Sequence, residues 1–183
     1  MAQIKVITKN APDAFYDEKY KDRYAVEDVI RYIFNPQKAK GYVGGWAVDP
    51  NCAAYEMELL AYLHHKDSGV RLRHWVITFA DFELNRICSK YKRNIPEALY
   101  QLGFEFSAFY ASRYQIVFAA HLDTSSPHLH FVMNSVSYVD GTKFPGTKAD
   151  LYDYEKYAKQ VGRSYDFHIY TVTDHSATNP SSF

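Results

Sequence analysis

The sequence predicts an α+β domain, in which a central antiparallel β-sheet has helices packed mainly on one face and carries a histidine metal site. Strand-like and helix-like segments do not alternate regularly along the chain, which argues against a parallel α/β fold. Two apolar runs, 116–120 and 129–133, flank the turn-forming segment Thr-Ser-Ser-Pro at 124–127. Their strands are therefore expected to be antiparallel neighbours.

The composition indicates a single globular domain. The chain has 183 residues, 47% of them apolar, which suffices for one full core but not comfortably for two. We expect one domain over residues 1–175 and a polar tail at 176–183 that is flexible or begins a linker. The sequence has no run approaching the roughly 20 apolar residues of a transmembrane helix, no signal peptide and no disulfide framework, so we expect a cytoplasmic location.

The charge balance limits how the chain could hold nucleic acid. Lys plus Arg and Asp plus Glu each number 21, which gives a net charge of zero. A grip on DNA would therefore need a locally positive face. The 17 tyrosines and 12 phenylalanines could stack on bases or fill the core, and composition does not separate these roles.

Hydrophobic periodicity predicts the elements. Val26, Val29 and Ile33 recur at helical spacing, and their helix should stop before Asn35-Pro36 because proline disfavours helix in the residue before it. In chain order we predict a strand at 2–8, a loop or short irregular helix at 10–24, a helix at 25–34, a flexible loop at 41–50, a helix at 53–66, a strand at 71–80, helices at 81–91 and 96–111, the two hairpin strands, a turn at 140–141, a helix from 147 and a strand at 167–172.

Three histidines on the hairpin predict a metal site. Side chains alternate across a strand, so His128 and His130 project from the same face, and His121 ends the partner strand. Imidazole nitrogens suit several transition metals, and three neutral ligands leave the positive charge of the metal to attract a phosphate oxygen. Asp123 could orient one of the imidazoles or could simply begin the turn.

The spacing His121-x-Asp-x-x-x-x-His-x-His-x-x-x-Asn134 resembles the third motif of the relaxase/mobilisation nuclease family, within the His-hydrophobe-His endonuclease superfamily. The segment Tyr32–Lys38 resembles the first motif of that family, and His74–Phe79 is similar to the second. The three motifs occur in the family's order, and the resemblance covers roughly residues 25–160. Family members are usually longer, with helical C-terminal regions.

The resemblance implies a conjugative relaxase that nicks one DNA strand at an origin of transfer and can rejoin it. Tyr32 would attack the phosphodiester and form a 5′-phosphotyrosyl link, assisted by a divalent metal ion, Mn²⁺ or Mg²⁺ (other transition metals remain open), and Tyr16, Tyr20 and Tyr24 are alternatives. The implied partner is single-stranded DNA next to an inverted-repeat hairpin. Accessory relaxosome proteins, a coupling protein and the cytoplasm of a bacterial donor cell complete this expectation.

Several polar residues are candidates for the remaining roles. Tyr32 and Asp123 are the predicted catalytic residues, and Asp81 is a weaker carboxylate candidate near Tyr32. The predicted DNA-binding residues are Lys38, His74, Asn134, Arg86, Lys92 and Arg93. For the last three, a solvated helix face is the ordinary alternative.

Three other functions stay open on sequence grounds. A rolling-circle replication initiator usually has its tyrosine after the histidines, whereas Tyr32 precedes them. A three-histidine hydrolase would use metal-activated water and would not need Tyr32. A non-catalytic single-strand binder would not need the histidines.

Overall fold

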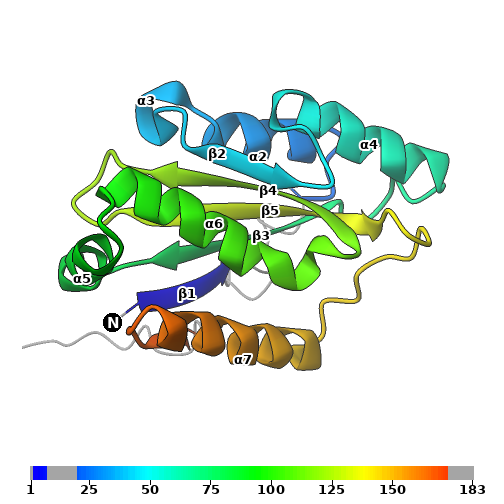
Figure 1. Cartoon of the computed structure of the whole chain (residues 1–183). Coiled ribbons are helices and arrows are strands. Elements are labelled where there is room, and N and C mark those ends of the chain that lie inside the picture. Colours follow the sequence, from blue (N-terminus) through cyan, green and yellow to red (C-terminus); the bar gives the residue numbers. More distant parts are fainter. Residues whose placement is uncertain (1, 8–19, 173–183) are drawn as a thin grey trace, which may run out of the picture.

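A computed structural model describes residues 2–7 and 20–172 (Figure 1). A six-stranded sheet forms its centre, in the order β2-β4-β5-β3-β1-β6. The strands are β1 (Ala2–Ile7), β2 (Val43–Trp46), β3 (Leu72–Thr78), β4 (Tyr114–His121), β5 (His128–Ser137) and β6 (Ile169–Val172). β1 and β6 pair in parallel and every other neighbouring pair is antiparallel, which confirms the predicted α+β class.

Helices lie on both sides of this sheet (Figure 1). They are α2 (Ala25–Ile33), α3 (Pro36–Ala39), α4 (Ala53–Leu63), α5 (Asp81–Tyr91), α6 (Ile95–Ala111) and α7 (Lys148–Ser164), with a short 3₁₀ turn at Pro50–Cys52. The 17-residue helices α6 and α7 cover one face together with α5. The shorter α2, α3 and α4 cover part of the other. No helix in the described ranges is long and apolar enough to span a membrane.

Large rings fill the space between the sheet and helices α5, α6 and α7. We call this side of β3, β4 and β5 the aromatic face. Trp75 and Phe131 come from neighbouring strands and stack with their ring centroids 5.2 Å apart. Phe118 on β4 and Phe106 on α6 are fully buried beside them. Burying such rings is the largest hydrophobic contribution that single side chains offer.

The opposite side of the same strands, the histidine face, has smaller apolar residues and imidazoles. Val117, Ala119 and Val132 pack there against Val26 and Ile30 of α2, within one buried cluster. The four histidines of this face are His74, His121, His128 and His130, which lie at odd positions of β4 and even positions of β3 and β5. Strand alternation therefore gives each of these strands one wholly apolar side and one that carries polar chemistry.

The prediction of a flexible loop at 41–50 is wrong. Residues Val43–Trp46 form edge strand β2, which pairs with β4. Its glycines suggested a loop, but Gly44 lies where a Cβ would come within 2.4 Å of the Phe118 ring. Glycine is needed here because the backbone passes close over a large side chain, a known reason for glycine inside a strand.

The other predicted elements are confirmed to within a few residues, apart from those at 8–19 and 173–183, which fall outside the described residues. Helix α7 begins where expected, with the Thr147 hydroxyl accepting from the Asp150 amide. The β4–β5 hairpin pairs His121 with His128 directly and His130 with Ala119. This register brings the three motif histidines to one end of the sheet.

Candidate active site

The site begins with a cluster of three imidazoles at the end of the β4–β5 hairpin. One ligand nitrogen from each of His121, His128 and His130 lies within 4.8 Å of the others. Two of these side chains are buried and His128 is half-buried. Cross-strand pairing brings them together without any loop having to fold back, so the rigid sheet fixes their spacing.

Each imidazole uses one nitrogen to hold its ring in place. His121 Nε2 lies 2.9 Å from the Ile33 carbonyl oxygen, and His128 Nδ1 lies 2.9 Å from the Ser126 carbonyl oxygen. His130 Nδ1 lies 2.9 Å from Nε2 of His74. These contacts fix which nitrogen of each ring faces the cluster, as is usual for metal-bound histidine.

The second nitrogen of His130 makes the strongest case for a metal. Its Nε2 is buried and has no hydrogen-bond partner among the described residues. A buried polar atom without a partner is costly unless something outside the chain satisfies it. Together with the opposing nitrogens of His121 and His128, it makes the donor set fit a divalent metal ion.

Burial keeps the cluster in the protonation state that metal binding requires. It lowers the pKa of His121, and it lowers the pKa of His130 to about 2 with a smaller contribution from nearby His74. Both imidazoles are therefore neutral at physiological pH, and a neutral imidazole presents the lone pair that a metal needs.

Tyr32 stands at the open side of this cluster. Its ring lies edge-on to His121 and His130, with centroid distances of 5.8 and 5.6 Å. The Lys38 ammonium is 4.4 Å from the centroid of the Tyr32 ring. Tyr32 is 49% exposed, so a ligand from solvent can reach it while the histidines lie behind it.

Backbone contacts anchor the helical corner that carries Tyr32 and Lys38. Tyr32 precedes Ile33, whose carbonyl binds His121, and the Lys38 carbonyl accepts from the Leu122 amide at 3.1 Å. Asn35 caps α3 by accepting from the Gln37 amide, which explains why the chain turns at Asn35-Pro36 instead of continuing α2. The corner is therefore tied to the sheet at the metal cluster.

The arrangement of a tyrosine, a lysine and three histidines at one point agrees with a comparison of the sequence with known families. Residues 32–167 match the model of "Relaxase: MobA/VirD2-like, nuclease domain". The chain belongs to this family. The match begins at Tyr32 and includes all three motifs, and relaxases of this kind are DNA-nicking enzymes.

One curated relative of this relaxase domain is Protein rlx of Staphylococcus aureus. It is 30% identical over 92 residues, which make up 46% of this chain and 28% of that protein. The chain thus matches little more than a quarter of the length of this relative. No solved structure gave a significant match.

Two of the predicted site residues lie apart from the imidazole contacts. Asp123 is exposed in the β4–β5 loop, and its charge partly opposes the lowering of the His121 pKa. Asn134 is 2% exposed and donates to the Met57 carbonyl and to Gln115 Oε1, deep in the histidine face. Asp81 is exposed at the first turn of α5.

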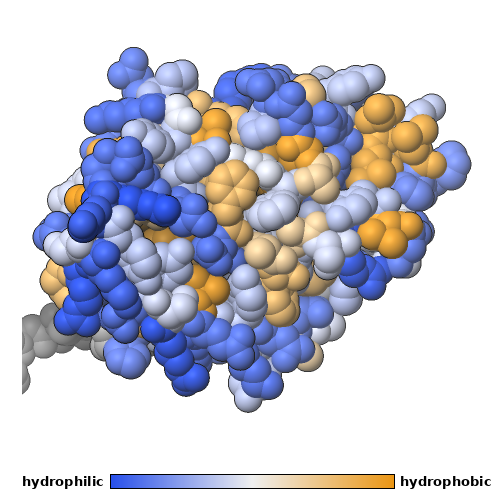
Figure 2. Space-filling model, viewed as in Figure 1, coloured by the Kyte–Doolittle hydropathy of each residue, from blue (hydrophilic) through white to orange (hydrophobic). Residues whose placement is uncertain are grey.

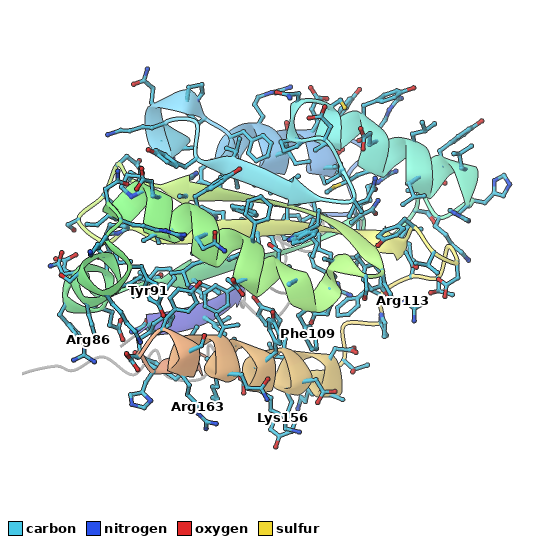
Figure 3. The ribbon with its side chains drawn as sticks, in the orientation of Figure 1. Arg86, Tyr91, Phe109, Arg113, Lys156 and Arg163 are labelled. Carbon is cyan, nitrogen blue, oxygen red and sulfur yellow. The ribbon has the colours of Figure 1, made fainter. Side chains whose placement is uncertain are left out.

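The predicted basic residues Arg86, Lys92 and Arg93 lie on or just after α5, on the other side of the sheet. Arg86 and Arg163 of α7 help to line an open pocket of about 440 Å³ that also includes Asp166 and His168. Figure 3 shows Arg86 and Arg163 at the same end of the two helices, and Figure 2 shows hydrophilic side chains over this region. The pocket is separate from the histidine cluster, and Arg86 and Lys90 both contact Asp166 there.

Sequence reasoning missed what holds the imidazoles. It proposed Asp123, but the partners are the carbonyls of Ile33 and Ser126 and the side chain of His74. The link to His74 could have been inferred from strand order, because His130 pairs with Val76, and His74 is the next residue on the same face of β3. The carbonyl partners leave no trace in the sequence.

Proposed function

We propose that this relaxase domain nicks one strand of DNA at an origin of transfer by transesterification, with Tyr32 as the nucleophile. One observation carries the proposal: an exposed tyrosine ring lies edge-on to two of three clustered histidines, with a lysine ammonium over it. The proposed substrate is single-stranded DNA beside an inverted-repeat hairpin. Accessory relaxosome proteins and a coupling protein are proposed partners in the cytoplasm of the donor cell.

In the proposed reaction the Tyr32 oxygen attacks the scissile phosphorus. A bond forms between that oxygen and phosphorus, and the bond from phosphorus to the 3′-oxygen breaks. The 3′-oxygen leaves with the electron pair and takes up a proton, while the phenol proton passes to solvent. Attack by the 3′-hydroxyl on the phosphotyrosine reverses the step and rejoins the strand, because no bond energy is lost to hydrolysis.

The proposed metal ligands are His121, His128 and His130, and the proposed ion is Mn²⁺ or Mg²⁺. When bound there, the ion supplies Lewis-acid polarisation of the scissile phosphate. Imidazole ligands favour Mn²⁺ over Mg²⁺, which prefers oxygen ligands and keeps its water. The rings contribute a fixed orientation, because each is held by its other nitrogen.

Lys38 is proposed to assist Tyr32. A phenol is a poor nucleophile at neutral pH because little of it is ionised, and a nearby cation stabilises the negative charge that develops on it. The ammonium of Lys38 lies close enough to the ring to act in this way and to attract a phosphate oxygen. Asp123, exposed near His121, is proposed to add a weaker electrostatic influence on that ligand.

The other predicted DNA contacts separate into two groups. Arg86, Lys92 and Arg93 are exposed and are proposed to hold backbone phosphates away from the nick. His74 and Asn134 are 5% and 2% exposed, so we assign them to supporting the site from within the histidine face.

The test is a nicking assay on an origin-derived single-stranded oligonucleotide labelled at both ends, with Mn²⁺ present. Wild type should give a protein-linked product carrying the DNA 3′ of the nick, and Tyr32→Phe should give none. Tyr24→Phe, an equally exposed tyrosine one residue before α2, is the matched control and should behave as wild type. A covalent product that survives in Tyr32→Phe would refute the assigned nucleophile, and cleavage without any covalent product would indicate hydrolysis by activated water.

A further inference from the structure

A line of hydrogen-bonded rings runs from the metal cluster into the protein. His130 Nδ1 lies 2.9 Å from His74 Nε2, and His74 Nδ1 lies 3.1 Å from the Tyr20 hydroxyl. His74 and His130 are each 5% exposed, and their ring centroids are 5.2 Å apart. Solvent therefore contributes little to holding either ring.

The direction of these hydrogen bonds follows from the chemistry of a neutral imidazole. If Nε2 of His130 gives its lone pair to a metal, its proton must be on Nδ1, and it donates to His74 Nε2. His74 then carries its own proton on Nδ1 and donates to the Tyr20 oxygen. Each ring has one tautomer that satisfies both of its neighbours, so the line selects the metal-binding form of His130.

The backbone fixes the position of the acceptor ring. His74 belongs to β3 and pairs with Val132 of β5, so it stands diagonally beside His130 on the histidine face. The Tyr20 end of the line is also tied to β3, because the Tyr20 carbonyl accepts from the Arg71 amide at 3.1 Å. Both ends of the line are thus held by the strand that carries His74.

We propose that His74 is a positioning residue for the metal: it orients His130 and holds it in the tautomer that presents Nε2, with Tyr20 fixing His74 in turn. This gives the histidine of the second motif a role that does not require contact with DNA. It also gives Tyr20 a role other than that of a reserve nucleophile. The inference rests on the three-histidine group binding a metal, and it is independent of which residue attacks the phosphate.

The experiment measures Mn²⁺ binding to metal-free protein by titration calorimetry, without DNA. His74→Phe keeps an aromatic ring but removes the acceptor, and we expect Mn²⁺ affinity to fall by about 10- to 100-fold, the usual loss when a ligand's supporting hydrogen bond is removed. His74→Gln presents an amide oxygen at a similar reach and should recover most of the affinity. Tyr20→Phe should cause a smaller loss, and His168→Phe, an exposed histidine away from the cluster, should cause none.

Circular dichroism and thermal unfolding of each metal-free variant separate a lost fold from a lost contact. A folded His74→Phe that binds Mn²⁺ within twofold of wild type would overturn the inference. So would a folded His74→Gln as weak as His74→Phe, because bulk and not hydrogen bonding would then be at work. Wild type that binds no Mn²⁺ would overturn both this inference and the metal assignment of the proposed function, whereas normal Mn²⁺ binding with no nicking would affect only the proposed function.

Discussion

The two faces of the central sheet use the same strands for different purposes. On the aromatic face, Trp75, Phe118 and Phe131 are packed ring against ring beneath the long helices α6 and α7. On the histidine face, the neighbouring residues His74 and His130 are held by hydrogen bonds at the edge of shorter helices. Residues that adjoin in sequence therefore belong to environments with different energetics.

This separation teaches how a small domain can carry four imidazoles at one site and still be stable. Buried polar groups cost free energy unless they are paired, and one Nε2 is left for a ligand in the site described above. The aromatic face offsets that cost with fully buried apolar rings. Substitutions on the two faces should therefore have separable effects, on activity from one side and on stability from the other.

The largest separation is expected for His128→Ala. His128 is half-buried and its described hydrogen bond is to a loop carbonyl, so its removal should change the free energy of unfolding little. Loss of a metal ligand removes several kcal/mol of stabilisation from the charged transition state, and nicking should fall by about a thousandfold or more. Nicking rates and chemical unfolding of the same preparation measure both quantities, and His168→Ala is the control. Nicking within tenfold of wild type would remove His128 from the site.

The opposite result is expected on the aromatic face for Phe131→Ala. Phe131 is fully buried, stacks on Trp75 and also contacts Phe106 and Phe118, so the variant should lose about 3–5 kcal/mol of unfolding free energy. Mn²⁺ affinity should stay near that of wild type at temperatures where the variant is folded. Phe82→Ala, with a ring that is 60% exposed, is the matched control and should cost little. A large loss of Mn²⁺ affinity in folded Phe131→Ala would mean that the two faces are coupled.

Acid should destabilise the histidine face selectively in metal-free protein. The folded-state pKa of His121 and of His130 lies below the model value of 6.5, so the unfolded chain binds more protons once the pH falls below that value. The free energy of unfolding must then fall as the pH falls, by about 1 kcal/mol from His130 alone between pH 7 and pH 5.5. Urea unfolding in EDTA at several pH values measures this slope. His130→Gln should show a shallower slope, and equal slopes for the two proteins would contradict the assignment.

The sequence predicted the faces better than it predicted what supports the site. Alternation along 128–134 separated the imidazoles from Leu129, Phe131 and Met133, and this division is confirmed. Helix and strand bounds followed from periodicity and from capping residues such as Thr147. These features are local, so a short window of sequence contains them.

Features that depend on distant contacts were not predicted. Strand β2 was taken for a loop because its glycines were read alone, without the Phe118 ring that makes them necessary. A carboxylate, Asp123, was chosen to support the histidines by chemical habit, whereas backbone carbonyls and a fourth histidine occupy those positions. Such partners become visible only once strand order and register are known.

The smallest effect is expected from the basic residues outside the aromatic face. Arg86 and Arg163 lie at one end of α5 and α7 (Figure 3), in a chain with no net charge, so any phosphate they contact would be held by local charge alone. If each contacts one phosphate, Arg86→Gln and Arg163→Gln should each reduce the slope of log affinity against log salt by about 1 and leave nicking at saturating DNA unchanged. Lys156→Gln, further along α7, is the control for loss of charge without loss of a contact. An unchanged slope in both arginine variants would mean that the aromatic face serves stability alone, and that the DNA is held entirely from the side of Tyr32 and the histidines.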